Sequence, residues 1–296
     1  MKKRRSNKHY LLSTREKVVL GIVFVLLLLY ALSLIYPFVF LLINSFKEDP
    51  EFLNDPLGFP KTWVTSSYEY AFTEFIVYSP GEGTETGLLG MFWNSISLSI
   101  VETIVSMFLT CCAAYVLAKY KFFGNKFLYS FIIVSSVIPT IAAIAATYKL
   151  MANTELIGHF IGMIILECGA FGGGFLYIHS YFKSIPWTFA ESAMMDGASD
   201  FKIFWRIMIP MAKNGILTFT IMRFLGYWNG YWMPFLFYSN HPTLAVGLSM
   251  LSANSLNHGA YTELFAAMIV SIVPVIIFYA IFQKQLLSNT IDGGLK

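Results

Sequence analysis

The stretch that decides the fold lies at residues 191–210 and reads ESAMMDGASDFKIFWRIMIP. It is a polar, charged island, and long apolar runs lie on both sides of it. Apolar runs of about 20 residues are long enough to cross a bilayer as helices. We therefore expect the island to lie outside the bilayer, on one face of a membrane protein.

Within this island the turn-forming residues predict two short helices with a break between them. Pro186 suits the start of the first helix, and Gly197 is well placed to end it in a left-handed conformation. Ser199 can cap the second helix, with Asp200 in its first turn facing the positive end of the helix dipole. A helix–Gly–helix element on the face of a membrane protein is a shape that another protein could bind.

The composition also indicates a bilayer. The 296 residues are 56% hydrophobic and 12% charged, whereas soluble domains are about 25% charged. The net charge of +3 is small, and the sequence has no long basic segment interleaved with aromatic residues. We therefore expect no nucleic acid among the partners.

Three cysteines, Cys111, Cys112 and Cys168, lie inside apolar runs. Their spacing matches neither a metal site nor a disulfide framework. The simplest interpretation is that they are small buried residues. We expect no metal and no bound cofactor in this chain.

Six apolar runs predict an all-α, polytopic membrane protein with six transmembrane helices. The first run follows a basic segment, is too long for a signal peptide and has no small-residue cleavage site, so we expect it to be retained. A polar loop after it, 47–88, should carry one short amphipathic helix near 66–75. The expected spans are 18–46, 91–118, 127–150, 157–182, 212–238 and 262–283.

The placement of charge orients these spans. Sixteen of the 20 lysines and arginines fall in four segments, 1–17, 119–127, 183–213 and 284–296, which lie on the same side if six spans separate them. The positive-inside rule makes that side the cytoplasm. The opposite side carries the acidic loop 47–88. Both termini and the island at 191–210 are therefore expected in the cytoplasm.

The island resembles the "EAA" loop of ABC importer permeases, which are the membrane-spanning subunits that dock an ATPase. The family pattern is Glu-Ala-Ala, three residues, Gly, nine residues and Ile-x-Leu-Pro, and five positions match it at the family spacing. Ser192 and Ile209 depart from the pattern by small changes. The matching residues are Glu191, Ala193, Gly197, Ile207 and Pro210.

The resemblance extends from about Asn94 to the C-terminus and is to the carbohydrate branch of these permeases, the maltose-transporter type, in its second-subunit form. Short motifs along the chain carry it, including Trp228-Asn229 and the tail that begins at Asn289. The further motifs are Asn94-Ser95, Ala114-Tyr115, Leu117-Ala118, Lys119-Tyr120, Pro139, Tyr181-Phe182, Ile185-Pro186, Thr243-Leu244 and Gln283.

The resemblance implies a binding-protein-dependent importer in a bacterial-type inner membrane. Its expected partners are a second, different permease subunit, an ATPase dimer that binds ATP and Mg, an extracytoplasmic sugar-binding protein and the lipid bilayer. The sequence contains no nucleotide-binding loop of the Gly-x-x-x-x-Gly-Lys-Ser/Thr type. We therefore expect no enzyme activity in this chain, and ATP hydrolysis on another.

The apolar runs, the charge pattern and the resemblance together divide the chain into expected segments. The coupling loop, 183–211, would lie between spans four and five and would act through Glu191, Ser192, Ala193, Asp196, Gly197 and Pro210. The expected segments are a basic cytoplasmic N-terminus at 1–17, the first span and extracytoplasmic loop at 18–90, a permease core with five spans at 91–284 and a cytoplasmic tail at 285–296.

Charged residues inside the spans are candidates for a substrate path, because such residues usually face a bundle interior or a wet cavity. Glu102, Glu167, His179 and Arg223 lie in or near the membrane. Glu167 or Arg223 could line a sugar path. Alternatively, these residues pair structurally with each other or with polar groups on neighbouring helices.

The fifth span adds aromatic candidates for the same path. Flat rings stack on sugar C–H surfaces, and an amide can bond hydroxyls, so the set suits an oligosaccharide. The alternative is an aromatic belt at the outer interface, where Trp and Tyr are enriched. The candidates are Tyr227, Trp228, Asn229, Tyr231 and Trp232.

Two other functions remain as alternatives to sugar import. An importer permease for another solute class, such as an amino acid or a phosphonate, is the nearer one. A membrane-embedded enzyme would need clustered His, Asp, Glu or Ser, but the five histidines are scattered over different segments. The sequence does not name the sugar, its length or its linkage.

Overall fold

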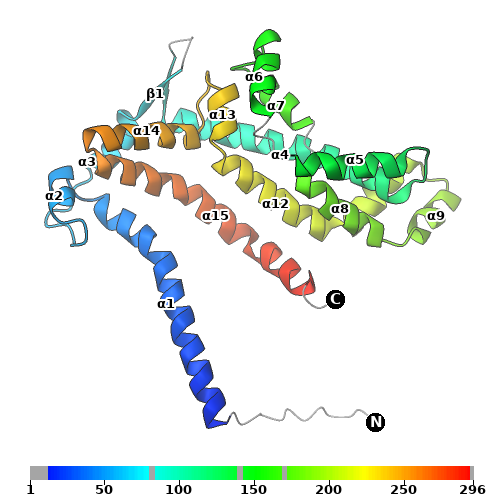
Figure 1. Ribbon diagram of the computed structural model, residues 1–296, viewed down its shortest axis with the longest axis horizontal. Helices are drawn as coiled ribbons and strands as arrows, with labels where there is room; N and C mark the ends of the chain where they lie inside the picture. Colours follow the sequence, from blue (N-terminus) through cyan, green and yellow to red (C-terminus); the bar gives the residue numbers. More distant parts are fainter. Residues whose placement is uncertain (1–12, 80–83, 139–142, 169–171, 294–296) are drawn as a thin grey trace.

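The computed structural model describes residues 13–79, 84–138, 143–168 and 172–293 (Figure 1). These residues are mostly helical, and the expected fold class is confirmed at that level. The helices are α1 (Thr14–Asn44), α2 (Asp49–Asn54), α3 (Ser66–Thr73), α4 (Leu88–Lys119), α5 (Asn125–Val137), α6 (Ile144–Asn153), α7 (Phe160–Cys168), α8 (Gly172–Ser184), α9 (Thr188–Met195), α10 (Asp200–Ile203), the π-helix η2 (Phe204–Met208), α11 (Ile209–Met211), α12 (Lys213–Asn229), α13 (Trp232–Phe237), α14 (Leu244–His258) and α15 (Tyr261–Gly293).

Some features expected from the sequence lie outside the described residues. They are the first twelve residues of the basic N-terminus, the Gly-Glu-Gly stretch at 81–83, Pro139, Gly169 and the last three residues of the tail.

The two strands β1 (Ile76–Tyr78) and β2 (Glu85–Gly87) pair antiparallel, with Val77 opposite Thr86. This small sheet in the loop between α1 and α4 was not expected from the sequence.

The N-terminal part of the first helix, α1, projects away from the rest of the protein (Figure 1), and its C-terminal end packs against α15. Ser13 and Glu16 form a capping box, in which the Ser13 hydroxyl accepts from the Glu16 N–H and the Glu16 carboxylate accepts from the Ser13 N–H. Such a box satisfies two of the donors that a helix start leaves unpaired. The most apolar part of α1 buries none of its residues within the chain. Lipid or another protein must therefore cover it.

The 32-residue helix α4 forms the centre of the bundle. It lies against α7, α8, α12 and α14, and its buried face carries small and polar residues such as Ser95, Ser99 and Ser106. Small residues allow helices in a membrane to approach closely. The Ser95 hydroxyl accepts a hydrogen bond of 2.7 Å from the N–H of Leu244, which fixes the start of α14 against α4.

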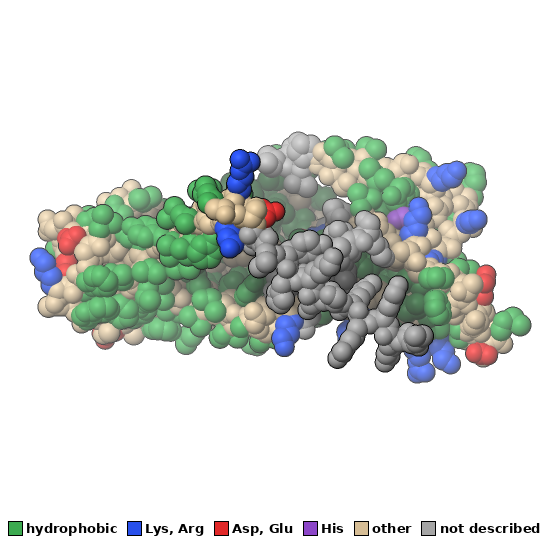
Figure 2. Space-filling view, turned by 90° about the horizontal axis from the view of Figure 1, so that it is seen from below, with side chains coloured by type: hydrophobic (Ala, Val, Ile, Leu, Met, Phe, Trp, Pro, Cys, Tyr) green, Lys and Arg blue, Asp and Glu red, His purple; other side chains and the backbone are tan. Residues whose placement is uncertain are grey.

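Three described helices are long and apolar enough to cross a membrane, namely Thr14–Asn44, Leu88–Lys119 and Tyr261–Lys284. They coincide with the first, second and sixth expected spans. Figure 2 shows hydrophobic side chains over much of one face of the protein, with few charged side chains among them. The helical content, the apolar helices and the exposed apolar surface all suit a membrane protein.

The third and fifth expected spans are not single helices, which corrects the sequence-based expectation. α5 ends at Val137 with Ile138 extended, and α6 begins at Ile144. α12 ends at Asn229, and Gly230 is extended at φ −69° and ψ 118°. Pro234 suits the second break, because it has no N–H to donate to the carbonyl of Gly230, four residues earlier.

At one end of the long axis lie the loop elements α2 and α3, and α9 lies at the other end (Figure 1). The short helix expected near 66–75 is confirmed as α3. α14 was not expected. It begins after Thr243 and ends at Gly259, whose φ of +76° is the left-handed conformation of a helix C-terminus.

Candidate functional site

The polar island forms the two short helices that the sequence predicts. α9 begins at Thr188, two residues later than expected from Pro186, and Gly197 follows it with φ +78°. The N–H of Gly197 donates to the Met194 carbonyl and that of Ala198 to the Ala193 carbonyl, each over 2.9 Å. This is a Schellman ending, which needs a residue in the left-handed region. The predicted role of Gly197 as a helix stop is confirmed.

The second helix, α10, continues almost without interruption toward α12. Ser199 caps α10 by accepting from the Lys202 N–H. The chain then widens into η2, where the N–H of Ile209 reaches the Phe204 carbonyl, five residues back. Pro210 follows at once and has no N–H of its own, so the widened turn accommodates it. α10, η2, α11 and α12 therefore form a nearly unbroken rod from the island to Asn229.

The island is fastened to the end of α4. The Tyr120 hydroxyl donates to the Asp200 carboxylate over 3.1 Å and lies 3.3 Å from the Tyr115 hydroxyl. Lys119 donates to the Ile185 carbonyl, and the Trp187 ring meets the Tyr120 ring edge-on at 5.7 Å. These contacts attach the segments before and after the Gly197 turn to the same end of α4.

Most of the predicted coupling residues are exposed and do not pack against the end of α4. Glu191, Ser192, Asp196 and Gly197 are exposed, as is Pro210. Ala193 is half-buried against the core, and the Ser192 hydroxyl donates to the Thr188 carbonyl over 2.9 Å. Large apolar side chains are exposed on the same element, including Met195 at 88% and Phe201 at 73%. This is a rigid, partly apolar surface with an acidic residue at Glu191.

The break at Gly230 separates two cavities. The first, which we call the acidic cavity, has a volume of about 320 Å³ and is lined from α4, α7, α12 and α13. Glu102 and Glu167 line it together with Tyr227 and Trp232. Two carboxylates beside aromatic rings can bind a hydroxyl-rich molecule.

Glu167 is already bonded within the chain. The Tyr227 hydroxyl donates to its carboxylate, and Arg223 donates to the same hydroxyl over 3.2 Å. The Arg223 guanidinium also lies over the Phe219 ring, 5.4 Å from its centroid. The structure thus brings three of the predicted path residues together, and the pairing suggested by the sequence runs through Tyr227.

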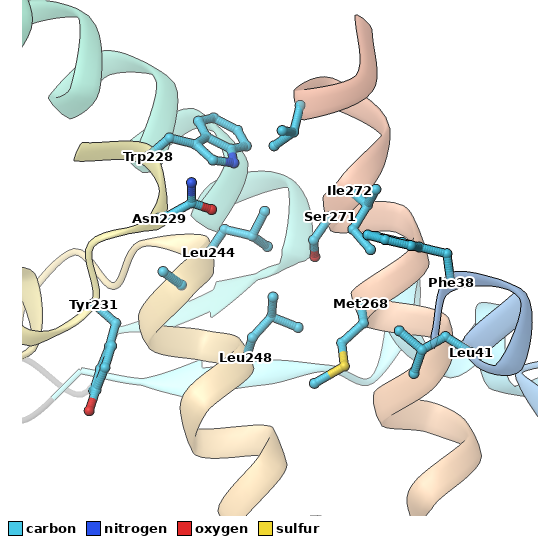
Figure 3. Close-up of a pocket in the computed structure, with 12 residues that line it drawn as sticks. Phe38, Leu41, Trp228, Asn229, Tyr231, Leu244, Leu248, Met268, Ser271 and Ile272 are labelled. Atoms are coloured by element: carbon cyan, nitrogen blue, oxygen red, sulfur yellow. The ribbon is translucent and has the colours of Figure 1, made fainter. Parts of the chain in front are cut away.

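The second cavity, which we call the apolar cavity, has a volume of about 380 Å³. Figure 3 shows Trp228, Asn229 and Tyr231 on one side of it, with Phe38 of α1 and Met268 of α15 on the other. Two of its polar groups are used inside their own helices, because the Asn229 amide donates to the Leu225 carbonyl and the Ser271 hydroxyl donates to the Ala267 carbonyl. Most of the other lining residues are apolar, such as Leu244, Leu248 and Met268.

The aromatic path candidates do not form one surface. Trp228 is only 8% exposed and packs against Phe92 and Phe224. Trp232 is 48% exposed and stacks on Phe235. Asn229 and Tyr231 line both cavities.

Two residues that were not predicted as site residues lie at the candidate site, one in the acidic cavity and one beside the Gly197 turn. Glu102, which the sequence marked only as charged and near the membrane, lines the acidic cavity. Tyr120 holds the island in place, and its only signal in the sequence was the Lys119-Tyr120 motif. No pattern in the sequence indicated that Tyr120 would reach Asp200, 80 residues away.

Comparison with known proteins identifies the arrangement. The family described as "Binding-protein-dependent transport system inner membrane component" matches residues 108–290. The chain belongs to this family. The resemblance seen in the sequence is thereby confirmed, and the chain is an inner-membrane permease component.

Relatives of this permease cover nearly all of its length. It is 29% identical to the diacetylchitobiose uptake system permease protein NgcG of Streptomyces coelicolor, over 92% of this chain and 87% of that protein. It is also 29% identical to the arabinooligosaccharides transport system permease protein AraQ of Bacillus subtilis, over 90% of this chain and 92% of that protein.

A solved structure shares the fold. This permease superimposes with a TM-score of 0.75 and 26% identity on a chain of a bacterial ABC transporter involved in the import of the acidic polysaccharide alginate. The match covers 92% of this permease and 98% of that chain.

Proposed function

We propose that this chain is one transmembrane permease subunit of an ATP-driven importer that moves a sugar or oligosaccharide into the cytoplasm. Two observations carry the proposal: the family match, and relatives that are named for sugar uptake and align with nearly the whole chain. An extracytoplasmic binding protein would deliver the sugar, and transport would proceed by alternating access. The acidic cavity supplies a compartment of suitable chemistry within the bundle.

We propose six spans with both termini in the cytoplasm. α1, α4 and α15 supply three, and the pairs α5–α6, α7–α8 and α12–α13 would supply the other three. The distribution of lysine and arginine supports this orientation. The position of α9, at the opposite end from α2 and α3, also supports it (Figure 1). The segments 1–17, 18–90, 91–284 and 285–296 keep the roles expected from the sequence.

We infer that the surface around α9 docks an ATPase subunit, which would bind ATP and Mg. Three features support this inference: the turn at Gly197, the exposed carboxylate of Glu191 and the exposed apolar side chains Met195 and Phe201. A carboxylate there can form a charge-assisted hydrogen bond to a basic group. The rod from α10 to α12 would carry movement of the docked surface to Tyr227 at the acidic cavity.

A second, different permease would complete the pore. The exposed apolar length of α1 supports such a partner, because contiguous apolar surface of this extent marks either a membrane or a protein interface. The outer elements α2, α3 and β1–β2 would face the binding protein. The sugar path would use Glu167, Arg223, Tyr227, Trp228, Asn229, Tyr231 and Trp232.

The test is to measure sugar uptake and ATP hydrolysis in the same proteoliposomes, with the two permeases, the ATPase and the binding protein present. We expect one neutral oligosaccharide to stimulate hydrolysis and to accumulate inside. Stimulation by an amino acid or a phosphonate would overturn the sugar assignment.

Charge reversal tests the docking surface in the same assay. Glu191→Lys should leave the chain in the membrane but lower uptake at least fivefold, through weaker docking or uncoupled hydrolysis. The matched control is Lys121→Glu, an exposed reversal in the loop between α4 and α5, which should transport normally. Equal uptake by both variants would remove Glu191 from the docking surface.

A further inference from the structure

A third pocket, which we call the basic pocket, lies where the end of α4, the start of α5 and the end of α8 meet. Its volume is about 320 Å³, and it shares no lining residue with the acidic or the apolar cavity. α8 leads from it directly toward α9 (Figure 1). Neither the proposed sugar path nor the proposed docking surface uses this pocket.

Two cations line the basic pocket, one from each of two helices. They are Lys126 of α5 and Lys183 of α8, and the described lining contains no Asp or Glu. Among the residues that the structure describes, no carboxylate pairs with either ammonium group. Because like charges repel and each attracts an anion, an anion in this pocket would be held by both lysines.

Uncharged donors lie beside the two lysines. The hydroxyls of Tyr129 and Ser130 also line the pocket. The 13-residue helix α5 begins here at Asn125, after Gly124 with φ +89°, and no side chain caps its first turn. The start of a helix leaves N–H groups unpaired and favours negative charge. The pocket therefore combines fixed positive charge with several hydrogen-bond donors, which suits a phosphate group.

The surface next to the pocket is strongly apolar. Phe122 and Phe123 are exposed in the loop just before α5. On α5 itself the exposed rings of Phe127 and Phe131 stack with their centroids 6.3 Å apart, and Val134 is exposed one turn further on. Residues at this spacing share one face of a helix. A free phosphate ion would leave this face uncovered, whereas the acyl chains of a phospholipid would cover it.

We propose that the basic pocket binds the phosphate-bearing headgroup of an anionic phospholipid, whose acyl chains lie along Phe127, Phe131 and Val134. The inference rests on the proposed orientation of the spans, which places this pocket at the cytoplasmic leaflet, where anionic lipids and basic side chains attract each other. A bound headgroup would join α5 to α8 just before the docking surface around α9.

The experiment titrates phospholipids onto the assembled importer in detergent and counts the bound molecules by native mass spectrometry. The probes are phosphatidylglycerol, which is anionic, and phosphatidylcholine, which has no net charge, both with dioleoyl chains. We expect the wild-type importer to retain at least one phosphatidylglycerol that an excess of phosphatidylcholine does not replace.

Three double variants test whether the two lysines hold this lipid. Lys126→Gln with Lys183→Gln should weaken its binding about tenfold, because two cations near the headgroup are lost. Both side chains are exposed, so folding should not be affected. Lys126→Arg with Lys183→Arg keeps the charge and should bind as the wild type does.

The matched control is Lys121→Gln with Lys213→Gln, which removes the same charge from exposed positions outside the pocket. It should bind phosphatidylglycerol normally. Equal loss of the lipid from this control and from the pocket variant would overturn the proposal, because it would show a general effect of net charge. Undiminished binding by the glutamine variant of the pocket would also overturn it.

The source of the phosphate group is tested with excess inorganic phosphate. We expect it to leave the bound phosphatidylglycerol in place, because free phosphate lacks the apolar contacts along α5. Displacement by inorganic phosphate would overturn the lipid assignment in favour of a free anion. This assay needs neither sugar nor ATP hydrolysis, so its failure would leave the proposed sugar import intact, and a failure of sugar import would leave the lipid site intact.

Discussion

The Tyr120 hydroxyl donates a 3.1 Å hydrogen bond to the Asp200 carboxylate, and this contact joins the end of α4 to the start of α10. Burial raises the pKa of Tyr120 above its usual value, and the neighbouring Tyr115 and Asp200 raise it further. The hydroxyl therefore remains a donor well above neutral pH. Because α4 lines the acidic cavity and α10 follows the docking turn, this bond links the two proposed functional regions.

Tyr120→Phe should weaken transport without preventing assembly. It removes the bond to Asp200 but keeps the ring that packs against Trp187, so stability should fall by about 1 kcal/mol. We expect uptake per hydrolysed ATP to fall two- to fivefold. The measurement is paired uptake and hydrolysis in proteoliposomes.

The control for this substitution is Tyr148→Phe, because Tyr148 packs against Phe237 through its ring and lies outside the island. Asp200→Asn should mimic Tyr120→Phe, and the double variant should add little to either single one. Full additivity of the two substitutions would show that the pair does not act as a unit.

The sequence predicts features that depend on neighbouring residues. The stop at Gly197, the cap at Ser199, the helix α3 and the long helices α1 and α4 follow from local chemistry and hydrophobic runs. The helix α14 was missed. The break at Gly230 was also missed, because an apolar run of span length predicts one continuous helix and does not show where that helix is interrupted. The sequence therefore predicts where an apolar segment lies better than it predicts whether that segment forms one continuous helix.

Contacts between distant segments account for the rest of what sequence reasoning missed. Glu102, Glu167 and Arg223 are equally visible as intramembrane charges. Only the packed structure shows that Tyr227 bonds two of them and leaves Glu102 without a donor among the described residues. Likewise, two separate cavities around Asn229 replace the single aromatic path that the fifth span suggested.

Gly197→Ala should impair docking through backbone strain alone. The left-handed conformation at φ +78° penalises a Cβ by about 1–2 kcal/mol, whereas open space surrounds the position, so no side-chain clash contributes. We expect ATPase binding to weaken about tenfold, as measured by co-purification at increasing salt. Gly197→Asn should be milder, because Asn tolerates this conformation better.

The matched control for Gly197 is Gly21→Ala in α1, where a Cβ also meets open space but the residue is helical. That variant should bind the ATPase normally. Normal binding by Gly197→Ala as well would mean that the turn does not need its left-handed geometry for docking.

The proposed orientation predicts which thiols a membrane-impermeant reagent reaches. In a background without Cys111, Cys112 and Cys168, a cysteine replacing Met195 should react only from the cytoplasmic side. One replacing Thr62, which is exposed in the outer loop, should react only from outside. Labelling of sealed vesicles of both orientations measures this. The reverse pattern would overturn both the topology and the docking proposal.

Substitutions of Trp228 and Trp232 should have different effects, because Trp228 packs inside the protein and Trp232 lines the acidic cavity. Trp228→Ala removes a ring buried against Phe92 and Phe224, so it should destabilise the permease by about 3–5 kcal/mol and lower uptake mainly through loss of folded protein. Trp232→Ala removes a half-exposed ring at the acidic cavity. It should leave the melting temperature unchanged and raise the sugar concentration needed for half-maximal uptake about fivefold.

Thermal unfolding in detergent, measured beside uptake, distinguishes the effect of Trp228→Ala on folding from the effect of Trp232→Ala on sugar contact. Normal uptake by Trp232→Ala would place this ring in an aromatic belt and would leave the sugar contacts to the partner permease.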